Sequence, residues 1–157
     1  MTAKLTHLDD RGHAHVVDVG DKPVTRRRAE AQAIVRTTPE VAAAILSRAM
    51  PKGDVLAVAR VAAIQGCKRT SELVPLCHPI GLTHVSVDVK VSRKGRVRLV
   101  VACECVGQTG VEMEALTGAS VGALAIYDMI KGVDRRASIR RVELLAKSGG
   151  RSGDFRR

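Results

Sequence analysis

Several positions of this chain combine acid/base groups with cations in spacings that suit chemistry on a phosphorylated molecule. Asp128 and Lys131 lie three residues apart, and Lys52 and His78 stand in short motifs. Glu112-Met113-Glu114 places two carboxyl groups close together. Lysine and histidine can hold phosphate oxygens, and an aspartate–lysine pair can transfer protons near neutral pH when burial and mutual attraction adjust the two pKa values. This combination predicts chemistry on a nucleotide.

Each of these residues also has a purely structural interpretation. Asp128 and Lys131 share a helix face at this spacing and can form an ordinary surface ion pair. A single histidine such as His78 more often serves structure than function. Glu112 can stabilise the start of a helix. Spacing alone leaves these alternatives open.

Length and composition indicate one domain over residues 1–157, with anionic partners. The chain carries a formal net charge of +10, which favours nucleic acid, an acidic membrane surface or a phosphorylated metabolite. Tyr127 and Phe155 are the only aromatic residues, so the core must consist of Val, Ala, Leu and Ile.

The sequence predicts a soluble, cytoplasmic protein without a membrane partner. Residues 1–10 are polar, unlike a secretory signal, and no apolar run approaches the ~18 residues that span a bilayer. The cysteines should be reduced, because Cys67, Cys77, Cys103 and Cys105 form no C-x-x-C pair. We expect Cys103 and Cys105 to face the core.

Alternating valines predict an antiparallel hairpin over residues 82–106, with its turn at Arg93-Lys94-Gly95. Weaker strand patterns cover His15–Val19, Ala29–Arg36 and Ile139–Ala146. These segments can extend the same sheet.

Three helices are predicted from their start signals. Thr38-Pro39-Glu40 precedes a helix over residues 41–50, and Asp54 caps one that reaches about residue 67. Thr109 and Glu112 have capping-box spacing before the longest helix, which reaches about residue 131 and ends at Gly132.

Gly118 and Gly122 share one face of the longest helix and predict close packing against the sheet or a partner helix. The Gly/Ser-rich tail, residues 147–157, is expected to be mobile until an anion orders it. The order of elements predicts an α+β domain with helices on one face of an antiparallel sheet.

Several motifs together resemble one family. They are K-G-D-V at 52, L-C-H-P at 76, G-V-E-M-E-A-L-T at 110, Y-D-M at 127 with Lys131, L-L-A-K-S-G-G at 144 and S-G-D-F at 152. Nearly the whole chain resembles the MoaC family, the cyclic pyranopterin monophosphate synthases of molybdenum cofactor biosynthesis. The resemblance implies a ferredoxin-like α+β fold and a homohexamer, built as a trimer of dimers with sites at subunit interfaces.

The resemblance also implies a reaction. The family converts (8S)-3',8-cyclo-7,8-dihydroguanosine 5'-triphosphate to cyclic pyranopterin monophosphate and pyrophosphate, as a lyase without a redox cofactor. Asp128 matches the catalytic acid/base position, with Lys131 one turn later. The matching substrate-binding positions are Leu76, Cys77, His78, Glu112, Met113, Glu114, Lys52, Arg27 and Lys147. Lys68 is left open between this site and a surface role.

Chemical roles follow for the charged members of this set. Glu112 and Glu114 can accept the N–H groups of the guanine-derived ring. Lys52, Arg27 and Lys147 can hold the triphosphate and the departing pyrophosphate, on which charge builds as the bond breaks. Cys77 is expected to pack rather than react.

Other site types fit the sequence poorly. Gly66-Cys67-Lys68-Arg69-Thr70 lacks the spacing of a P-loop, and no cysteine or histidine set has zinc-ligand spacing. We therefore predict no protein metal site, although Mg²⁺ can accompany the triphosphate.

The alternative function is a basic nucleic-acid-binding domain without catalysis. Its support is the charge, with cationic stretches at residues 93–98 and 135–141 that can follow a phosphate backbone. The scarcity of aromatic residues for base stacking argues against specific nucleic-acid binding. A noncatalytic subunit with the same fold is disfavoured, because every transferred site position keeps the expected residue.

Helix geometry adds a hypothesis about assembly. The 14 residues from Glu114 to Asp128 span about 21 Å in a continuous helix at about 1.5 Å per residue. One small ligand can hardly bridge them. Each site should therefore combine residues 112–114 of one chain with Asp128 and Lys131 of a neighbour.

Overall fold

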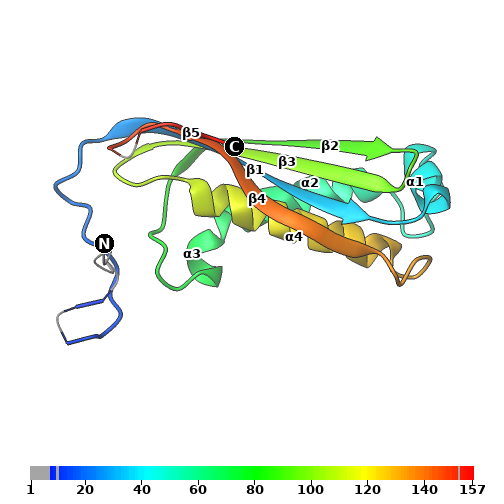
Figure 1. The fold of residues 1–157 in the computed structure, drawn as a ribbon, viewed down its shortest axis with the longest axis horizontal. Helices are drawn as coiled ribbons and strands as arrows, with labels where there is room; N and C mark the ends of the chain where they lie inside the picture. The colour runs from blue at the N-terminus through cyan, green and yellow to red at the C-terminus, as the bar shows by residue number, and fades with distance from the viewer. Residues whose placement is uncertain (1–7, 10, 152) are drawn as a thin grey trace.

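Five antiparallel strands form one sheet in the order β2-β3-β1-β4-β5 (Figure 1). The structure is a computed structural model that describes residues 8–9, 11–151 and 153–157. The strands are β1 (Thr25–Arg36), β2 (Leu82–Ser92), β3 (Arg96–Gly107), β4 (Ser138–Ser148) and β5 (Phe155–Arg156).

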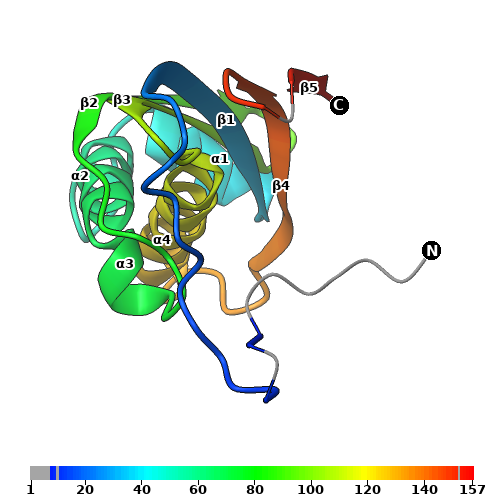
Figure 2. The same ribbon diagram turned by 90° about the vertical axis from the view of Figure 1, so that its left-hand side faces the viewer.

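Four helices pack against one face of this sheet and leave the other face uncovered (Figures 1 and 2). They are α1 (Pro39–Leu46), α2 (Val55–Lys68), α3 (Thr70–Leu73) and α4 (Glu112–Ile130). Within the described part of the chain, no helix combines the length and apolar character that crossing a membrane requires.

The topology confirms the predicted ferredoxin-like α+β fold. Strand β3 lies between β1 and β2, and β1 lies between β3 and β4, so each helical connection joins strands that are not neighbours. Two such interleaved β-α-β units define the split arrangement of this fold. Strand β5 adds a short edge beyond β4.

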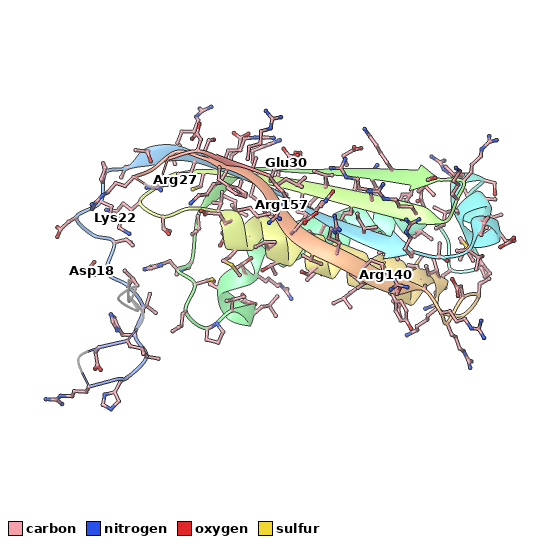
Figure 3. The ribbon with its side chains drawn as sticks, in the orientation of Figure 1. Asp18, Lys22, Arg27, Glu30, Arg140 and Arg157 are labelled. Atoms are coloured by element: carbon pink, nitrogen blue, oxygen red, sulfur yellow. The ribbon has the colours of Figure 1, made fainter. Side chains whose placement is uncertain are left out.

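The helix-facing side of β1 carries small residues. Ala29, Ala31, Ala33 and Val35 are almost fully buried, as the alternation of a half-covered strand requires. Alanine side chains project little, so α4 can lie close beneath the central strands. Residues on the opposite side of the same strand, including Arg28 and Glu30, belong to the uncovered face (Figure 3 labels Glu30).

The predicted hairpin is confirmed. Strands β2 and β3 pair from Leu82 to Ser92, and Gly95 in the turn has a φ of 77°. A β-carbon at Gly95 would also collide with the Thr37 carbonyl, so the glycine is required sterically as well as conformationally. Cys103 and Cys105 are buried as predicted.

Two of the predicted helix caps are confirmed. The Thr38 hydroxyl accepts the Val41 N–H at 3.3 Å, and the Asp54 carboxylate accepts the Leu56 and Ala57 N–H groups at 3.0 Å each. The first helix is shorter than predicted. It ends at Leu46, because Arg48 adopts a left-handed conformation with φ 57°.

Two local predictions were wrong. Thr109 does not cap α4, since Val111 occupies the cap position without a side-chain bond and Glu112 is drawn to Lys147. His15–Val19 forms no strand. The predicted end of the longest helix is confirmed, because Lys131 is the C-cap residue and Gly132 follows it directly.

Two further local features differ from what the sequence suggests. The short helix α3 was not predicted. In the tail, Phe155 and Arg156 pair with β4, whereas Ser152 lies outside the described residues. Tail mobility stays a prediction.

Close packing at Gly118 and Gly122 is confirmed. A β-carbon at Gly118 would meet the Cys67 sulfur and would lie 3.0 Å from the Ala63 carbonyl oxygen of α2. One at Gly122 would lie 3.1 Å from the Ala63 β-carbon and would press on Leu99 of β3. Both glycines therefore let α4 contact α2 and the sheet at once.

Gly118→Val is expected to lower the free energy of unfolding by about 1–3 kcal/mol, because overpacking forces the helices apart. Gly132→Val serves as the control, since no heavy atom lies within 4 Å of a β-carbon there. It should change stability by less than about 0.5 kcal/mol, measured by urea denaturation. Equal losses in both variants would contradict the close contact between α2 and α4.

Candidate functional site

The predicted site residues fall into two groups at opposite ends of α4. We call Leu76, Cys77, His78, Glu112, Met113, Glu114, Arg27 and Lys147 the amino-end cluster. Lys52, Asp128 and Lys131 form the carboxyl-end cluster. The structure of one chain brings the members of each cluster together but not the two clusters, as the helix length predicts.

The amino-end cluster surrounds a cavity of about 420 Å³ beside the start of α4. Six of its predicted residues line the cavity: Leu76, Cys77, His78, Glu112, Met113 and Glu114. Val17, Val19, Lys22, Ile80, Thr109 and Gly110 complete the wall. The volume suits a small polar molecule.

His78 fixes one wall of this cavity. Its Nε2 lies 2.8 Å from the Val17 carbonyl oxygen. Because a carbonyl only accepts, Nε2 must carry the donated proton. This bond attaches the segment before β1 to the loop before β2. The Val17 carbonyl therefore accepts a side-chain hydrogen bond instead of the backbone hydrogen bond that a strand at His15–Val19 would form.

Glu114 is the buried acid of the cavity. Its side chain is only 3% exposed, and its Oε2 atom has no hydrogen-bond partner among the described residues. Burial is the main cause that raises the pKa of the carboxyl group to about 7; a backbone hydrogen bond lowers this pKa, and the nearby charge of Glu112 adds a smaller upward contribution. Near neutral pH this group can both donate and accept a hydrogen bond.

Glu112 is held in a different electrostatic setting. Its Oε1 atom lies 3.1 Å from the Lys147 ammonium group, so the pair joins the first turn of α4 to the end of β4. The two neighbouring glutamates thus differ in kind, since Glu112 is ion-paired, whereas Glu114 is buried and its Oε2 atom has no hydrogen-bond partner among the described residues. Sequence spacing gave no sign of this difference.

Arg27 borders the cluster from β1. Its Nε donates to the Gly107 carbonyl at 2.9 Å, and its terminal nitrogen donates to the Gln108 carbonyl at 3.0 Å. A second concavity of about 490 Å³ is lined by Arg27, Lys22, Glu112 and Arg151 among others. Figure 3 shows Lys22 and Arg27 at the same end of the molecule.

Cys77 is suited to packing, as predicted. Burial raises the pKa of its thiol, with the charge of Glu114 as a second cause. The thiol therefore stays protonated near neutral pH and is a poor nucleophile.

The carboxyl-end cluster is a compact ion-paired group. One Asp128 oxygen lies 2.7 Å from the Lys131 Nζ and the other lies 3.1 Å from the Lys52 Nζ. The Lys52 Nζ also donates to the Asp128 carbonyl oxygen at 2.8 Å. Lys52 therefore lies beside the acid/base pair rather than with Arg27 and Lys147.

Attraction between opposite charges, rather than burial, shifts the pKa values in this cluster. Hydrogen bonds from Lys131 and then Lys52 lower the pKa of Asp128, and the bond from Asp128 raises the pKa of Lys131. The three side chains are 45–56% exposed, so desolvation contributes little. Of the two conditions set out in the sequence analysis, mutual attraction is present in the single chain, whereas burial of this pair is not.

Several lining residues escaped sequence reasoning. Val17 and Val19 were interpreted as strand residues, and Lys22 and Arg151 carried no motif of their own. Pro23, which follows Lys22, ends regular structure before β1. This proline was the one feature of the sequence that indicated a loop at this wall of the cavity. Lys68 at the end of α2 lines neither concavity of the amino-end cluster.

Comparison with protein families gives a match over most of the chain. The MoaC family model matches residues 16–150. A mutant of the ferredoxin protease FusC in complex with Arabidopsis ferredoxin shares 14% identity, covering 69% of this chain and 10% of that one, at a TM-score of 0.34. The full extracellular region of zebrafish Gpr126/Adgrg6 shares 14% identity, and the match covers 86% of this chain and 15% of that one, at a TM-score of 0.31. This chain thus spans only a small part of either protein.

Glu114→Gln is expected to flatten the dependence of stability on pH. The folded-state pKa of about 7 lies above the ordinary value of 4.5, so the folded chain binds the proton more tightly than the unfolded chain. The resulting stability is complete below about pH 4.5 and is lost as pH rises through about 7. The variant should reduce the loss between about pH 5 and pH 8 by about 2–3 kcal/mol in urea denaturation, at 1.36 kcal/mol per pKa unit.

Glu72→Gln, which removes an exposed carboxyl group in α3, provides the matched control. It should keep the pH dependence of the original protein. Identical pH profiles for the Glu114→Gln variant and the original protein would show that burial does not hold the Glu114 proton.

Proposed function

The chain belongs to the MoaC family, and we propose on that premise that it is a cyclic pyranopterin monophosphate synthase. The family gives it a role in molybdenum cofactor biosynthesis. In the proposed reaction it converts (8S)-3',8-cyclo-7,8-dihydroguanosine 5'-triphosphate to cyclic pyranopterin monophosphate and releases pyrophosphate. The observation that carries the proposal is the cavity in which six predicted substrate-binding residues meet.

The paired glutamates support recognition of the guanine-derived ring. That ring presents N–H donors and a carbonyl acceptor in fixed positions. Glu112, ion-paired with Lys147, offers acceptor oxygens, whereas a protonated Glu114 offers a donor and an acceptor together. Leu76 and Met113, 36% and 40% exposed, supply apolar surface beside them.

Cations around the cavity support binding of the triphosphate. Arg27 and Lys147 adjoin Glu112, and Lys22 and Arg151 extend the positive charge along the second concavity. Positive donors stabilise the charge that develops on the departing pyrophosphate. Any Mg²⁺ is expected to arrive on the triphosphate, and the proposal includes no redox cofactor.

The carboxyl-end cluster supplies the proton transfers in this proposal. Near neutral pH the lowered pKa keeps Asp128 ionised and the raised pKa keeps Lys131 protonated, and in the single chain the same shifts make Asp128 a weaker base and Lys131 a weaker acid. Their charged forms nevertheless suit a base and an acid that act on one reacting centre. Lys52 adds a positive charge within hydrogen-bond distance of Asp128.

Assembly of one site from two chains follows from the separation of the clusters. We propose that Lys52, Asp128 and Lys131 of one chain face the amino-end cavity of a neighbour in a homohexamer, a trimer of dimers. A covering subunit would desolvate the exposed pair and shift both pKa values back toward neutrality. A cytoplasmic location also stays a prediction.

Asp128→Ala and Lys131→Ala should each lower kcat/KM by about 10²–10⁴-fold, the usual contribution of a positioned acid or base. The assay supplies the cyclo-dihydroguanosine triphosphate and follows pyrophosphate and cyclic pyranopterin monophosphate together. Asp88→Ala and Lys90→Ala are matched controls, since they break another exposed aspartate–lysine pair, at 3.7 Å on β2. No product from the folded, assembled original protein would overturn the proposed function.

Mixed oligomers test the shared site. Glu114→Ala and Asp128→Ala chains damage opposite ends of α4, so each is expected to be inactive alone. Mixing them should restore part of the activity, because some interfaces then pair an intact cavity with an intact acid/base pair. Verified mixed oligomers without recovered activity would place each complete site within a single chain.

A further inference from the structure

The two basic stretches singled out in the sequence meet on the uncovered face of the sheet. Strand β1 runs between β3 and β4, which places Arg36 between Arg96 and the start of β4. A concavity of about 600 Å³ is lined there by Ile34, Arg36, Thr37, Lys94, Arg96, Arg140 and Arg141. We call its cations, Arg36, Lys94, Arg96, Arg140 and Arg141, the outer basic patch.

Like charges oppose one another directly in this patch. Arg36 and Arg96 are register partners across β1 and β3. Like charges directly opposite each other destabilise a strand pair. Such an arrangement costs stability unless an anion neutralises it.

Elsewhere on the uncovered face the cations have acidic partners. Arg28 lies 3.3 Å from Glu30 and 3.9 Å from Glu104, and Lys90 lies 3.7 Å from Asp88. The sheet therefore balances charge along most of this face.

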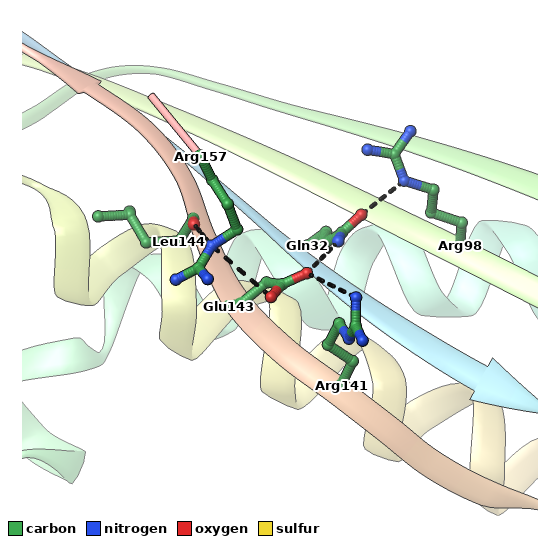
Figure 4. Close-up of polar contacts among 6 residues, drawn as sticks. All are labelled: Gln32, Arg98, Arg141, Glu143, Leu144 and Arg157. Atoms are coloured by element: carbon green, nitrogen blue, oxygen red, sulfur yellow. Dashed lines mark hydrogen bonds and ion pairs between the residues drawn. The ribbon is translucent and has the colours of Figure 1, made fainter. Parts of the chain in front are cut away.

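A polar network next to the patch shows the same balance (Figure 4). Glu143 lies 3.6 Å from both Arg141 and Arg157, and its Oε1 accepts a hydrogen bond from Gln32. Gln32 in turn accepts the Arg98 Nε at 2.6 Å. The Glu143 carboxylate thus interacts with three neighbouring side chains, those of Arg141, Arg157 and Gln32.

Within the part of the chain that the structure describes, four of the five patch cations lack such acidic partners, and only Arg141 shares Glu143. Among the described residues, no carboxylate oxygen lies within 4.0 Å of the side-chain nitrogens of Arg36, Lys94, Arg96 or Arg140. The nearby Asp134 is buried and accepts the Thr37 hydroxyl at 2.7 Å and the Arg136 N–H at 2.9 Å. Its bond with Thr37 attaches the edge of the concavity to the loop after α4.

We propose that the outer basic patch binds a short oligophosphate anion. Four of its five cations are arginines, whose planar groups match phosphate oxygens in pairs. They come from three neighbouring strands, which together span about 10 Å across the sheet at about 4.8 Å per strand spacing. A short phosphate chain can therefore reach several of them at once.

The surroundings favour phosphate groups over nucleic acid. Neither Tyr127 nor Phe155 lines the concavity, so no aromatic ring is available for base stacking. Carboxylates on the rest of the face, such as Glu30 and Glu143, interrupt any longer basic track.

The patch and the proposed substrate site consist of different residues. The patch shares no lining residue with the cavity at the amino end of α4 or with the carboxyl-end cluster. Figure 3 places Arg140 far along the sheet from Arg27. The inference therefore goes beyond the proposed function and does not rest on it.

Calorimetric titration of the full chain with inorganic tripolyphosphate tests the proposal. Arg36→Gln/Arg96→Gln should weaken the patch-dependent binding at least tenfold, and Arg140→Gln alone should weaken it about threefold. Arg60→Gln/Lys90→Gln removes the same net charge from cations outside the patch and should change affinity less than twofold. The Arg140→Gln variant keeps the test valid if the double variant fails to fold.

Two further titrations separate the alternatives. Lys52→Gln, in the proposed substrate site, should leave the patch-dependent binding of tripolyphosphate intact. If this variant loses the binding, the tripolyphosphate is bound at the substrate site. Equal weakening by the patch and control double variants would show unspecific attraction. Tighter binding of a short mixed-sequence RNA than of tripolyphosphate at the same salt concentration would assign the patch to nucleic acid. Any of these three results overturns the proposal.

Discussion

The close approach of α4 to its neighbours is the constraint on which the rest of the structure depends. Gly118 and Gly122 leave room for α2 and for Leu99 of β3, and the alanines of β1 leave room from above. With Trp absent and only two aromatic side chains, the core depends on fitting small groups tightly rather than on filling space with large ones. This packing holds α4 straight along the sheet, and α4 carries candidate residues at both of its ends.

The two ends of α4 use opposite physical means to adjust their acids. At the start, removal from water keeps the proton on Glu114. At the end, two lysines in solvent keep Asp128 ionised. One helix thus presents a carboxyl group that can donate and another that can only accept. A site built from both would have different groups for recognising a base and for moving protons.

The sequence predicted the framework well, because periodicity and caps are local. Alternating valines defined β2 and β3, and Thr38 and Asp54 marked helix starts correctly. The family motifs named residues that do cluster, including Leu76, His78 and Glu114 around one cavity. The predictions that were wrong concerned residues whose contacts come from segments distant in sequence. Lys147 draws Glu112 away from a capping role, and His78 engages the Val17 carbonyl where a strand was expected. The burial that shifts Glu114 likewise comes from the folded surroundings, which no local pattern displays.

The difference in sequence separation between the clusters bears on the order in which they form during synthesis. Asp128 and Lys131 are one helical turn apart, so their ion pair exists as soon as that turn does. The amino-end cluster instead needs Arg27 from the first strand and Lys147 from the fourth. Contacts between distant segments form late, since closing a long loop costs entropy before any contact rewards it. A growing chain on the ribosome would therefore possess its proton-transfer residues well before it possesses a complete pocket.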